Sequence, residues 1–227
     1  TIKLLSIIAG FGGNDTKSII ADMQSFDLSG VDAILSVSPY YNKPTQEGIY
    51  EHYKAIANST DLPIILYNVP GRTASNIRAT TTLQLANDFK NIIGIKEASN
   101  DWQQIFWLAR EKPADFYLIS GNDDLIVPQI SIGYDGVISV IANALPNQFS
   151  TMVHQALSGD FASAKKTVYE LDELITYLFE QGNPAGVKAT MKHLGVCDDY
   201  VRLPLMPIND ELRSKIAKKL KSMNLLA

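Results

Sequence analysis

The chain has 227 residues, of which 46% are hydrophobic and 19% are charged, so it can bury a sizeable core and is not intrinsically disordered. Its formal net charge of -4 argues against the broad basic surface that nucleic-acid binding needs, and no apolar run reaches the roughly 18 residues of a membrane span. The single cysteine, Cys197, excludes an intrachain disulfide, and we expect a reducing, cytoplasmic location.

Short apolar runs alternate with helical patterns along most of the chain. Strands are predicted over residues 4–10, 33–38, 91–99, 116–120 and 136–140, and residues 63–70 are predicted to form a strand together with its loop. Helices are predicted from a cap at Asn14 or Asp15 to about 29, then over 45–58, the low 80s, 102–110, 147–158, 161–180, 185–194 and 210–223. Strict alternation of strand and helix predicts a parallel sheet with right-handed crossovers.

The order of these elements predicts most of a TIM (β/α)8 barrel. About six βα units, the third to the eighth, would occupy residues 1–158, and a C-terminal helical region would occupy 159–227. An open parallel sheet is the alternative. In either fold, the loops at the carboxyl ends of the strands are where we expect the functional site.

Lys96 carries the strongest chemical signal, because it stands at the end of the apolar run in the predicted strand 91–99. Strand alternation predicts that it shares a face with Ile92 and with Gly94, which leaves room beside it, while Glu97 lies on the opposite face. Apolar surroundings destabilise a charged amine, and the neutral form attacks carbonyl carbons to give an imine. A lysine that simply extends into water is the plainer alternative.

The glycine-rich run that begins at Gly10 does not fit a dinucleotide-binding loop, because Asp15 stands where the fingerprint needs a small residue. Metal binding is also poorly supported. Asp123 and Asp124 are expected to cap a helix, not to bind a cation. The three histidines are far apart and fall on predicted helices: His52, His154 and His193.

Several residues follow strands and are predicted to lie near the amine. Tyr67 and Tyr41 each provide a phenol that could relay protons, although loop tyrosines often only pack at interfaces. Arg72 could hold a carboxylate with its planar guanidinium, although a solvated arginine is the commoner case. Gly121 and Ile138 would form the floor and wall of the pocket.

Four motifs occur in the order expected for one family of enzymes. They are SPYYNKP (38–44), YNVPGRT (67–73), GIKEA (94–98) and GVISV (136–140). With them the chain resembles the dihydrodipicolinate synthase family, within the N-acetylneuraminate lyase superfamily of lysine-dependent aldolases. The resemblance extends from about Ile7 to the C-terminal helices.

The resemblance implies a lyase of lysine and diaminopimelate biosynthesis. Lys96 would form a Schiff base with pyruvate, whose enamine attacks L-aspartate 4-semialdehyde to give 4-hydroxy-tetrahydrodipicolinate. Tyr67 would shuttle protons, and Tyr41 would complete this relay across a dimer interface. Arg72 would hold the carboxylate of the second substrate.

The resemblance also implies that Gly121 and Ile138 line the pyruvate site, and that Tyr40 lies at an interface near a feedback-lysine site. It implies no metal and no cofactor beyond the covalent imine on Lys96. The partners would be the two substrates and further copies of the chain, in a homotetramer of tight dimers.

Two alternatives remain open. An N-acetylneuraminate or other sugar-acid pyruvate aldolase is one, although Arg72 favours the synthase. The other follows from the family's Gly-Thr-Thr-Gly-Glu loop, which has no counterpart in this sequence. We therefore expect the sequence to be a piece of a longer protein, or a truncated form that is inactive and serves in binding or assembly.

Overall fold

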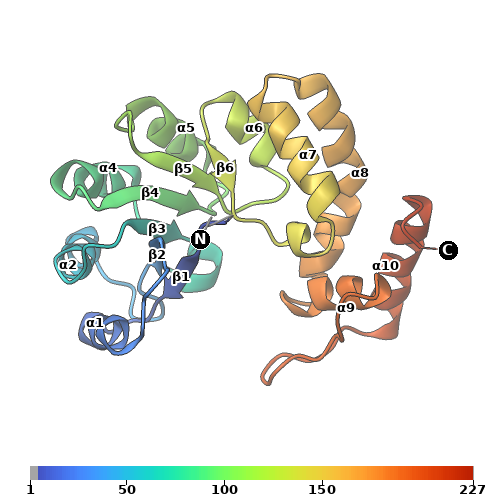
Figure 1. Cartoon of the computed structure of the whole chain (residues 1–227), viewed down its shortest axis with the longest axis horizontal. Coiled ribbons are helices and arrows are strands. Elements are labelled where there is room, and N and C mark those ends of the chain that lie inside the picture. Colours follow the sequence, from blue (N-terminus) through green and yellow to red (C-terminus); the bar gives the residue numbers. More distant parts are fainter. Residues whose placement is uncertain (1–4, 227) are drawn as a thin grey trace. The chain divides into compact units, whose positions relative to one another are not determined.

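A parallel sheet dominates the N-terminal part of the chain in the computed structural model, which describes residues 5–226 (Figure 1). Its strands are β1 (Ile8–Phe11), β2 (Ala33–Val37), β3 (Ile64–Asn68), β4 (Ile92–Glu97), β5 (Tyr117–Ser120) and β6 (Gly136–Val137). They lie in chain order, and each pairs in parallel with the next. The predicted parallel sheet is confirmed. The predicted start of the first strand, at Leu4, lies outside the described residues.

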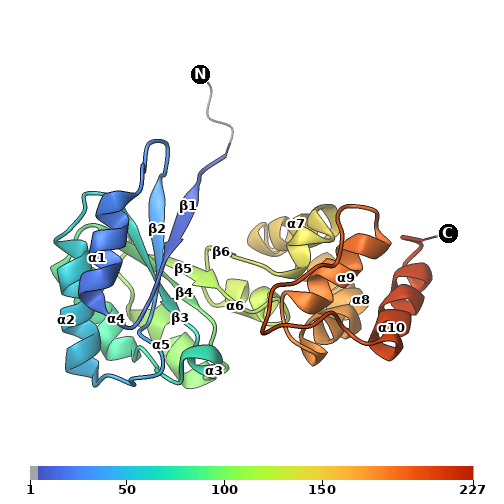
Figure 2. The ribbon, with the colours of Figure 1, turned by 90° about the horizontal axis from the view of Figure 1, so that it is seen from below.

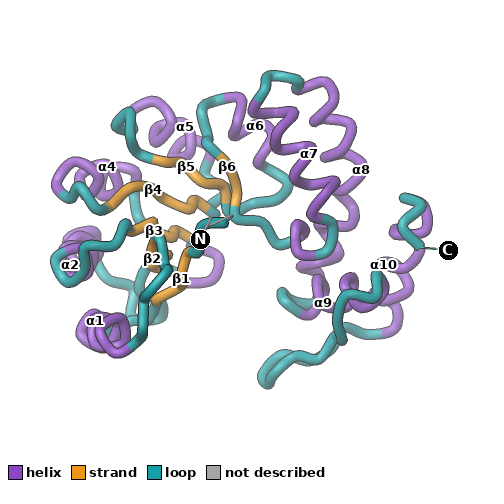
Figure 3. The backbone as a smooth tube through the Cα atoms, viewed as in Figure 1, coloured by secondary structure: helices purple, strands orange, loops and turns teal. Residues whose placement is uncertain are grey.

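Helices cover one side of this sheet, as Figure 3 shows by colour. They are α1 (Thr16–Ser25), α2 (Gln46–Ala57), α4 (Ala79–Asp88) and α5 (Trp102–Glu111). Asp15 caps α1 by accepting a hydrogen bond from the backbone of Lys17, which confirms one of the two predicted caps. The buried core combines apolar side chains from these helices and from the strands, among them Tyr53, Ile64 and Ile95.

The described chain forms two compact units. One contains the residues up to 122 together with 132–138, and the other contains 123–131 together with the residues from 139 onward. The second unit is helical, with α6 (Ile126–Ser131), η1 (Ile141–Asn143), α7 (Pro146–Leu157), α8 (Phe161–Glu180), α9 (Ala185–His193) and α10 (Asp210–Ser222). The predicted division into 1–158 and 159–227 stays a prediction, because it concerns the units of a complete barrel.

Two local predictions are wrong. The loop after β3 contains the short helix α3 (Pro70–Thr73), which Figure 2 shows at the carboxyl end of the sheet. The sixth strand ends at Val137, not at residue 140. It ends early because the backbone amides of Val140 and Ile141 donate to the buried carboxylate of Asp123, which takes them out of any strand ladder.

Within residues 5–226, no helix combines the length and the apolar character needed to cross a membrane.

Candidate functional site

Lys96 and Tyr67 form a cross-strand pair at the carboxyl ends of β4 and β3. Both side chains are partly buried. The Nζ atom of Lys96 lies 4.3 Å from the centre of the Tyr67 ring, within the range of a favourable cation–π contact. Burial raises the pKa of the Tyr67 hydroxyl, and the positive charge of Arg72 partly opposes that rise. The phenol is therefore protonated at neutral pH and can donate a proton beside the amine.

A β-bulge creates this pairing. Ile64 pairs with Ile92, but the next residue of β3, Ile65, pairs with Gly94, so β4 contains one extra residue at Ile93. Without that insertion, Tyr67 would stand opposite the residue before Lys96. The bulge also interrupts the alternation of side chains. Ile92 packs in the same core cluster as Ile95, and the prediction that it shares the face of the lysine is wrong.

Two glycines shape the space around the amine. A Cβ atom on Gly121 would lie 2.5 Å from Cβ of Ala98 and 3.2 Å from Cε of Lys96, so only glycine leaves room here for the lysine side chain. A Cβ atom on Gly94 would lie 2.7 Å from the carbonyl oxygen of Tyr117. Gly94 therefore permits the close approach of β5, and the predicted open space beside it does not exist.

A small, largely apolar pocket of about 320 Å³ opens at the carboxyl ends of β1, β2 and β3. Tyr67, Arg72 and Tyr40 all line it, together with apolar side chains such as Leu35 and Val37. Arg72 lies on α3 and is exposed, and its positive charge acts on the Tyr67 hydroxyl in the same pocket. The pocket has the size of a site for a small molecule, and Arg72 is the charged residue among those that line it.

Tyr40 lines this pocket, whereas Lys96, Gly121 and Ile138 are not among its lining residues. The backbone amide of Ile138 donates to Ser120, which places it next to Gly121. Tyr40 is 42% exposed at the pocket edge, whereas Tyr41 is 86% exposed and is not among the residues that line the pocket. Tyr41 also has a φ of 73°, an uncommon conformation for a bulky residue, and its amide donates to Thr73 at 3.3 Å.

Two buried carboxylates, one in each compact unit, received no functional role in the sequence analysis. Glu97 and Asp123 are both buried, and desolvation raises the pKa of each. Asp123 binds the backbone at the start of η1, where it acts as a cap. The only sequence signal for Glu97 was its predicted place on the face opposite Lys96.

Among residues 5–226, no group of three or more His, Cys, Asp or Glu side chains could hold a metal ion. The three histidines lie on α2, α7 and α9, as predicted.

These features define a class: a parallel α/β enzyme with a lysine–tyrosine pair at the carboxyl edge of its sheet, beside a pocket that contains an arginine. The family model described as the dihydrodipicolinate synthetase family matches residues 3–223. The chain belongs to this family.

Individual relatives agree. The 4-hydroxy-tetrahydrodipicolinate synthase of Phocaeicola vulgatus is 52% identical over 203 residues, a match that covers 89% of this chain and 68% of the relative. The solved synthase structure of Thermotoga maritima has a TM-score of 0.94 at 38% identity and covers 98% of this chain and 76% of its own. The chloride-inhibited synthase of Acinetobacter baumannii, solved with pyruvate, has a TM-score of 0.93 at 39% identity, with coverage of 99% and 77%.

The predicted family and the predicted synthase type of enzyme are therefore confirmed. The six parallel strands and their helices match the TIM-like fold of the solved synthases.

Proposed function

We propose that the chain condenses pyruvate with L-aspartate 4-semialdehyde through an imine on Lys96. The observation that carries this proposal is the position of the Lys96 amine, 4.3 Å from the ring of Tyr67 in a partly buried site. The names of the relatives support the reaction, and the pyruvate complex of the Acinetobacter baumannii synthase supports the first substrate.

The proposed chemistry begins when the Lys96 nitrogen attacks the keto carbon of pyruvate and water leaves, which forms the imine. Loss of a proton from the methyl carbon gives an enamine, and this carbon attacks the aldehyde to form the new carbon–carbon bond. The amino group of the second substrate then replaces the lysine nitrogen and closes the ring of 4-hydroxy-tetrahydrodipicolinate. Tyr67 would supply and remove protons at the imine-forming steps.

The other assignments follow from their places around the pocket. Arg72 would hold the carboxylate of the second substrate, and its place beside Tyr67 in one pocket supports this role. Gly121 and Ile138 would line the pyruvate site. No cofactor beyond the imine is proposed.

Two proposals concern the assembly. We infer a complete (β/α)8 barrel in the family's manner, of which this chain contributes the six described strands. We also infer a homotetramer of tight dimers, in which Tyr41 reaches a neighbouring copy and Tyr40 lies at the interface near a feedback-lysine site. The strong exposure of Tyr41 supports a place at an interface.

Trapping with borohydride tests the central step. Incubation with pyruvate and borohydride should add one reduced pyruvyl group to the peptide that contains Lys96, as measured by mass spectrometry. An unmodified Lys96 peptide at saturating pyruvate would refute the imine.

A matched pair of arginine variants tests the second substrate. Arg72→Ala should lower kcat/KM for aspartate semialdehyde strongly and leave imine trapping with pyruvate nearly unchanged. Arg110→Ala, which removes an exposed arginine on α5, should leave both at the wild-type level. A sugar-acid aldolase would instead tolerate Arg72→Ala and cleave a sialic acid.

A further inference from the structure

A buried carboxylate lies directly behind the reactive pair, on the opposite face of the same two strands. Glu97 follows Lys96 on β4, and Asn68 follows Tyr67 on β3. Asn68 and Glu97 are paired in the strand register, and both are fully buried, with 0% exposure. The sheet therefore has two consecutive cross-strand pairs: a reactive one on the pocket side and a hydrogen-bonded one on the helix side.

The Glu97 carboxylate is surrounded by hydrogen-bond donors. The Nδ2 atom of Asn68 lies 3.0 Å from both carboxylate oxygens, the backbone amide of Ser99 donates at 2.7 Å, and Nε2 of Gln104 donates at 2.9 Å. Burial raises the pKa of Glu97, and these hydrogen bonds oppose the rise. A partner set made only of donors fits an ionised carboxylate, which is an acceptor only.

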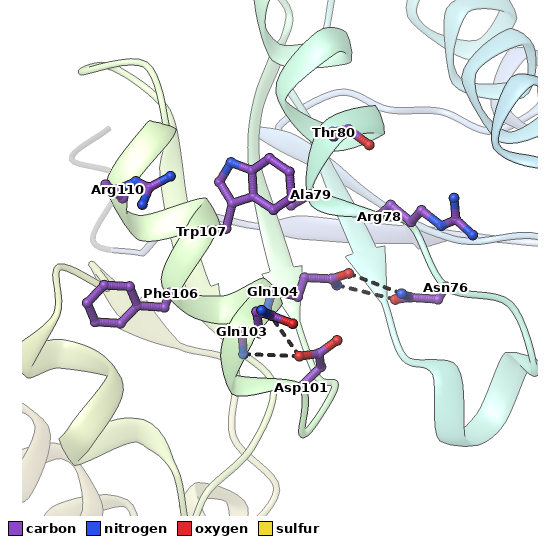
Figure 4. A pocket seen from close by; sticks show the side chains of 10 residues that line it. All are labelled: Asn76, Arg78, Ala79, Thr80, Asp101, Gln103, Gln104, Phe106, Trp107 and Arg110. Carbon is purple, nitrogen blue, oxygen red and sulfur yellow. Dashed lines mark hydrogen bonds between the residues drawn. The ribbon is translucent and has the colours of Figure 1, made fainter.

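The network continues beyond the carboxylate and connects the sheet to the helix layer. Asn76 accepts from Asn68 at 2.8 Å and donates to Gln104 at 3.0 Å, while the side-chain oxygen of Asn68 accepts from the backbone of Ile77. Figure 4 shows the paired amides of Asn76 and Gln104 in the wall of a groove of about 820 Å³. β3, β4, α5 and the loop before α4 are therefore joined by one set of hydrogen bonds.

This network lies at the end of the β3–β4 ladder that follows the bulge. The bulge at Ile93 shifts β4 by one residue against β3, and a slip of one residue would move every following side chain to a different partner. Asn68 and Glu97 form the first side-chain hydrogen bond across the two strands beyond the reactive pair. Their contact holds the register that puts Tyr67 opposite Lys96.

We propose that Glu97 is a positioning residue, whose carboxylate, held by Asn68 and Gln104, fixes the Lys96 amine against the Tyr67 ring. This inference rests on the proposed imine chemistry of Lys96. It assigns a kinetic role to residues on the helix side of the sheet, which do not touch the substrates.

The test compares Glu97→Gln and Asn68→Ala with a control just before β4. Glu97→Gln keeps the size of the side chain but replaces one acceptor oxygen by a donor, and Asn68→Ala removes the partner. The control is Asn91→Ala, in the residue that precedes β4, where the side-chain amide donates to the carbonyls of Ala57 and Thr60. All three changes remove hydrogen bonds from partly or fully buried groups.

Three measurements separate positioning from stability: thermal unfolding, the single-turnover rate of borohydride-trapped imine formation, and the pH profile of kcat/KM for pyruvate. Glu97→Gln and Asn68→Ala should slow imine formation on the order of 100-fold, as a displaced reacting group does, and shift the pH profile. Asn91→Ala should lower the unfolding temperature and leave the rate of the folded protein and its pH profile unchanged.

Two results would overturn parts of this reasoning separately. Wild-type protein that gains no mass at Lys96 would refute the imine and, with it, the role of Glu97. If the wild type is labelled and both network variants trap pyruvate at the wild-type rate with an unchanged pH profile, Glu97 serves stability alone. Should Glu97→Gln fail to fold, Asn68→Ala decides the question.

Discussion

Replacing Gly121 by alanine is the smallest change that should disturb the amine. The added methyl group would lie 2.5 Å from Cβ of Ala98 and 3.2 Å from Cε of Lys96. Carbon atoms in good contact are about 3.5–4.0 Å apart, so the contact with Ala98 must open by about 1 Å. Overpacking of this kind costs about 1–3 kcal/mol of stability. The contact with Cε of Lys96 must open by only a few tenths of an ångström, so the loss of rate should stay below the roughly 100-fold that a displacement of about 1 Å at a reacting group causes.

The assay is the rate of borohydride trapping at saturating pyruvate, measured beside thermal unfolding. Gly136→Ala is the matched control, because a Cβ atom at Gly136 meets nothing within 4 Å. We expect Gly121→Ala to lose both stability and trapping rate, and Gly136→Ala to keep the trapping rate. If Gly121→Ala unfolds at a lower temperature but traps pyruvate at the wild-type rate, the packing of Gly121 against the lysine does not control the chemistry.

Three further predictions follow from single side chains. Burial lowers the pKa of His52 from 6.5 to about 4. Between these two pH values His52 is protonated in the unfolded chain but neutral in the folded chain. At pH 5 this costs about 2 kcal/mol of stability, and His52→Gln should remove that loss in urea titrations at pH 5 and 7. Asp199, hydrogen-bonded to Lys192 and paired with Arg213, has its pKa lowered to about 2, so its stabilisation is complete above pH 3.8 and is lost as the pH falls through 2. Asp199→Asn should cost at most about 1 kcal/mol at pH 7, and an unchanged midpoint in urea would mean that solvent screens the pair. Tyr67→Phe keeps the ring beneath the amine but should slow imine formation about 100-fold or more, as loss of a proton donor does; a wild-type rate would exclude the hydroxyl from the relay.

The sequence predicts the framework of this site because the framework depends on patterns that repeat along the chain. Alternating apolar strands and helices allow one outcome, a parallel sheet, and the loops after its strands gather at one edge. The sequence alone therefore predicts that Lys96, Tyr67 and Arg72 lie near one another. Their motifs also indicate the family.

Features that depend on one local contact were not predictable in this way. The bulge at Ile93 arises from the fit between two strands, and no residue of the run 91–99 indicates a bulge by its type. The early end of β6 depends on Asp123, whose carboxylate meets Val140 only after the chain has folded. A prediction of side-chain faces from strand alternation assumes an uninterrupted ladder of backbone hydrogen bonds. The prediction fails wherever a side chain or an extra residue interrupts that ladder.

The two faces of β3 and β4 lead to different expectations for mutations. On the pocket side, Lys96 and Tyr67 are partly exposed, and a change there removes a reacting group while few buried contacts are lost. On the helix side, Asn68 and Glu97 have no exposure, so a change there leaves buried donors or acceptors unpaired and destabilises the fold. Because the two pairs are consecutive on the same strands, a helix-side variant should lose rate and stability together, whereas a pocket-side variant should lose rate alone. A plot of trapping rate against unfolding temperature should therefore separate the helix-side variants from the pocket-side variants. A single line through both groups would mean that changes on the two faces affect rate and stability in the same way.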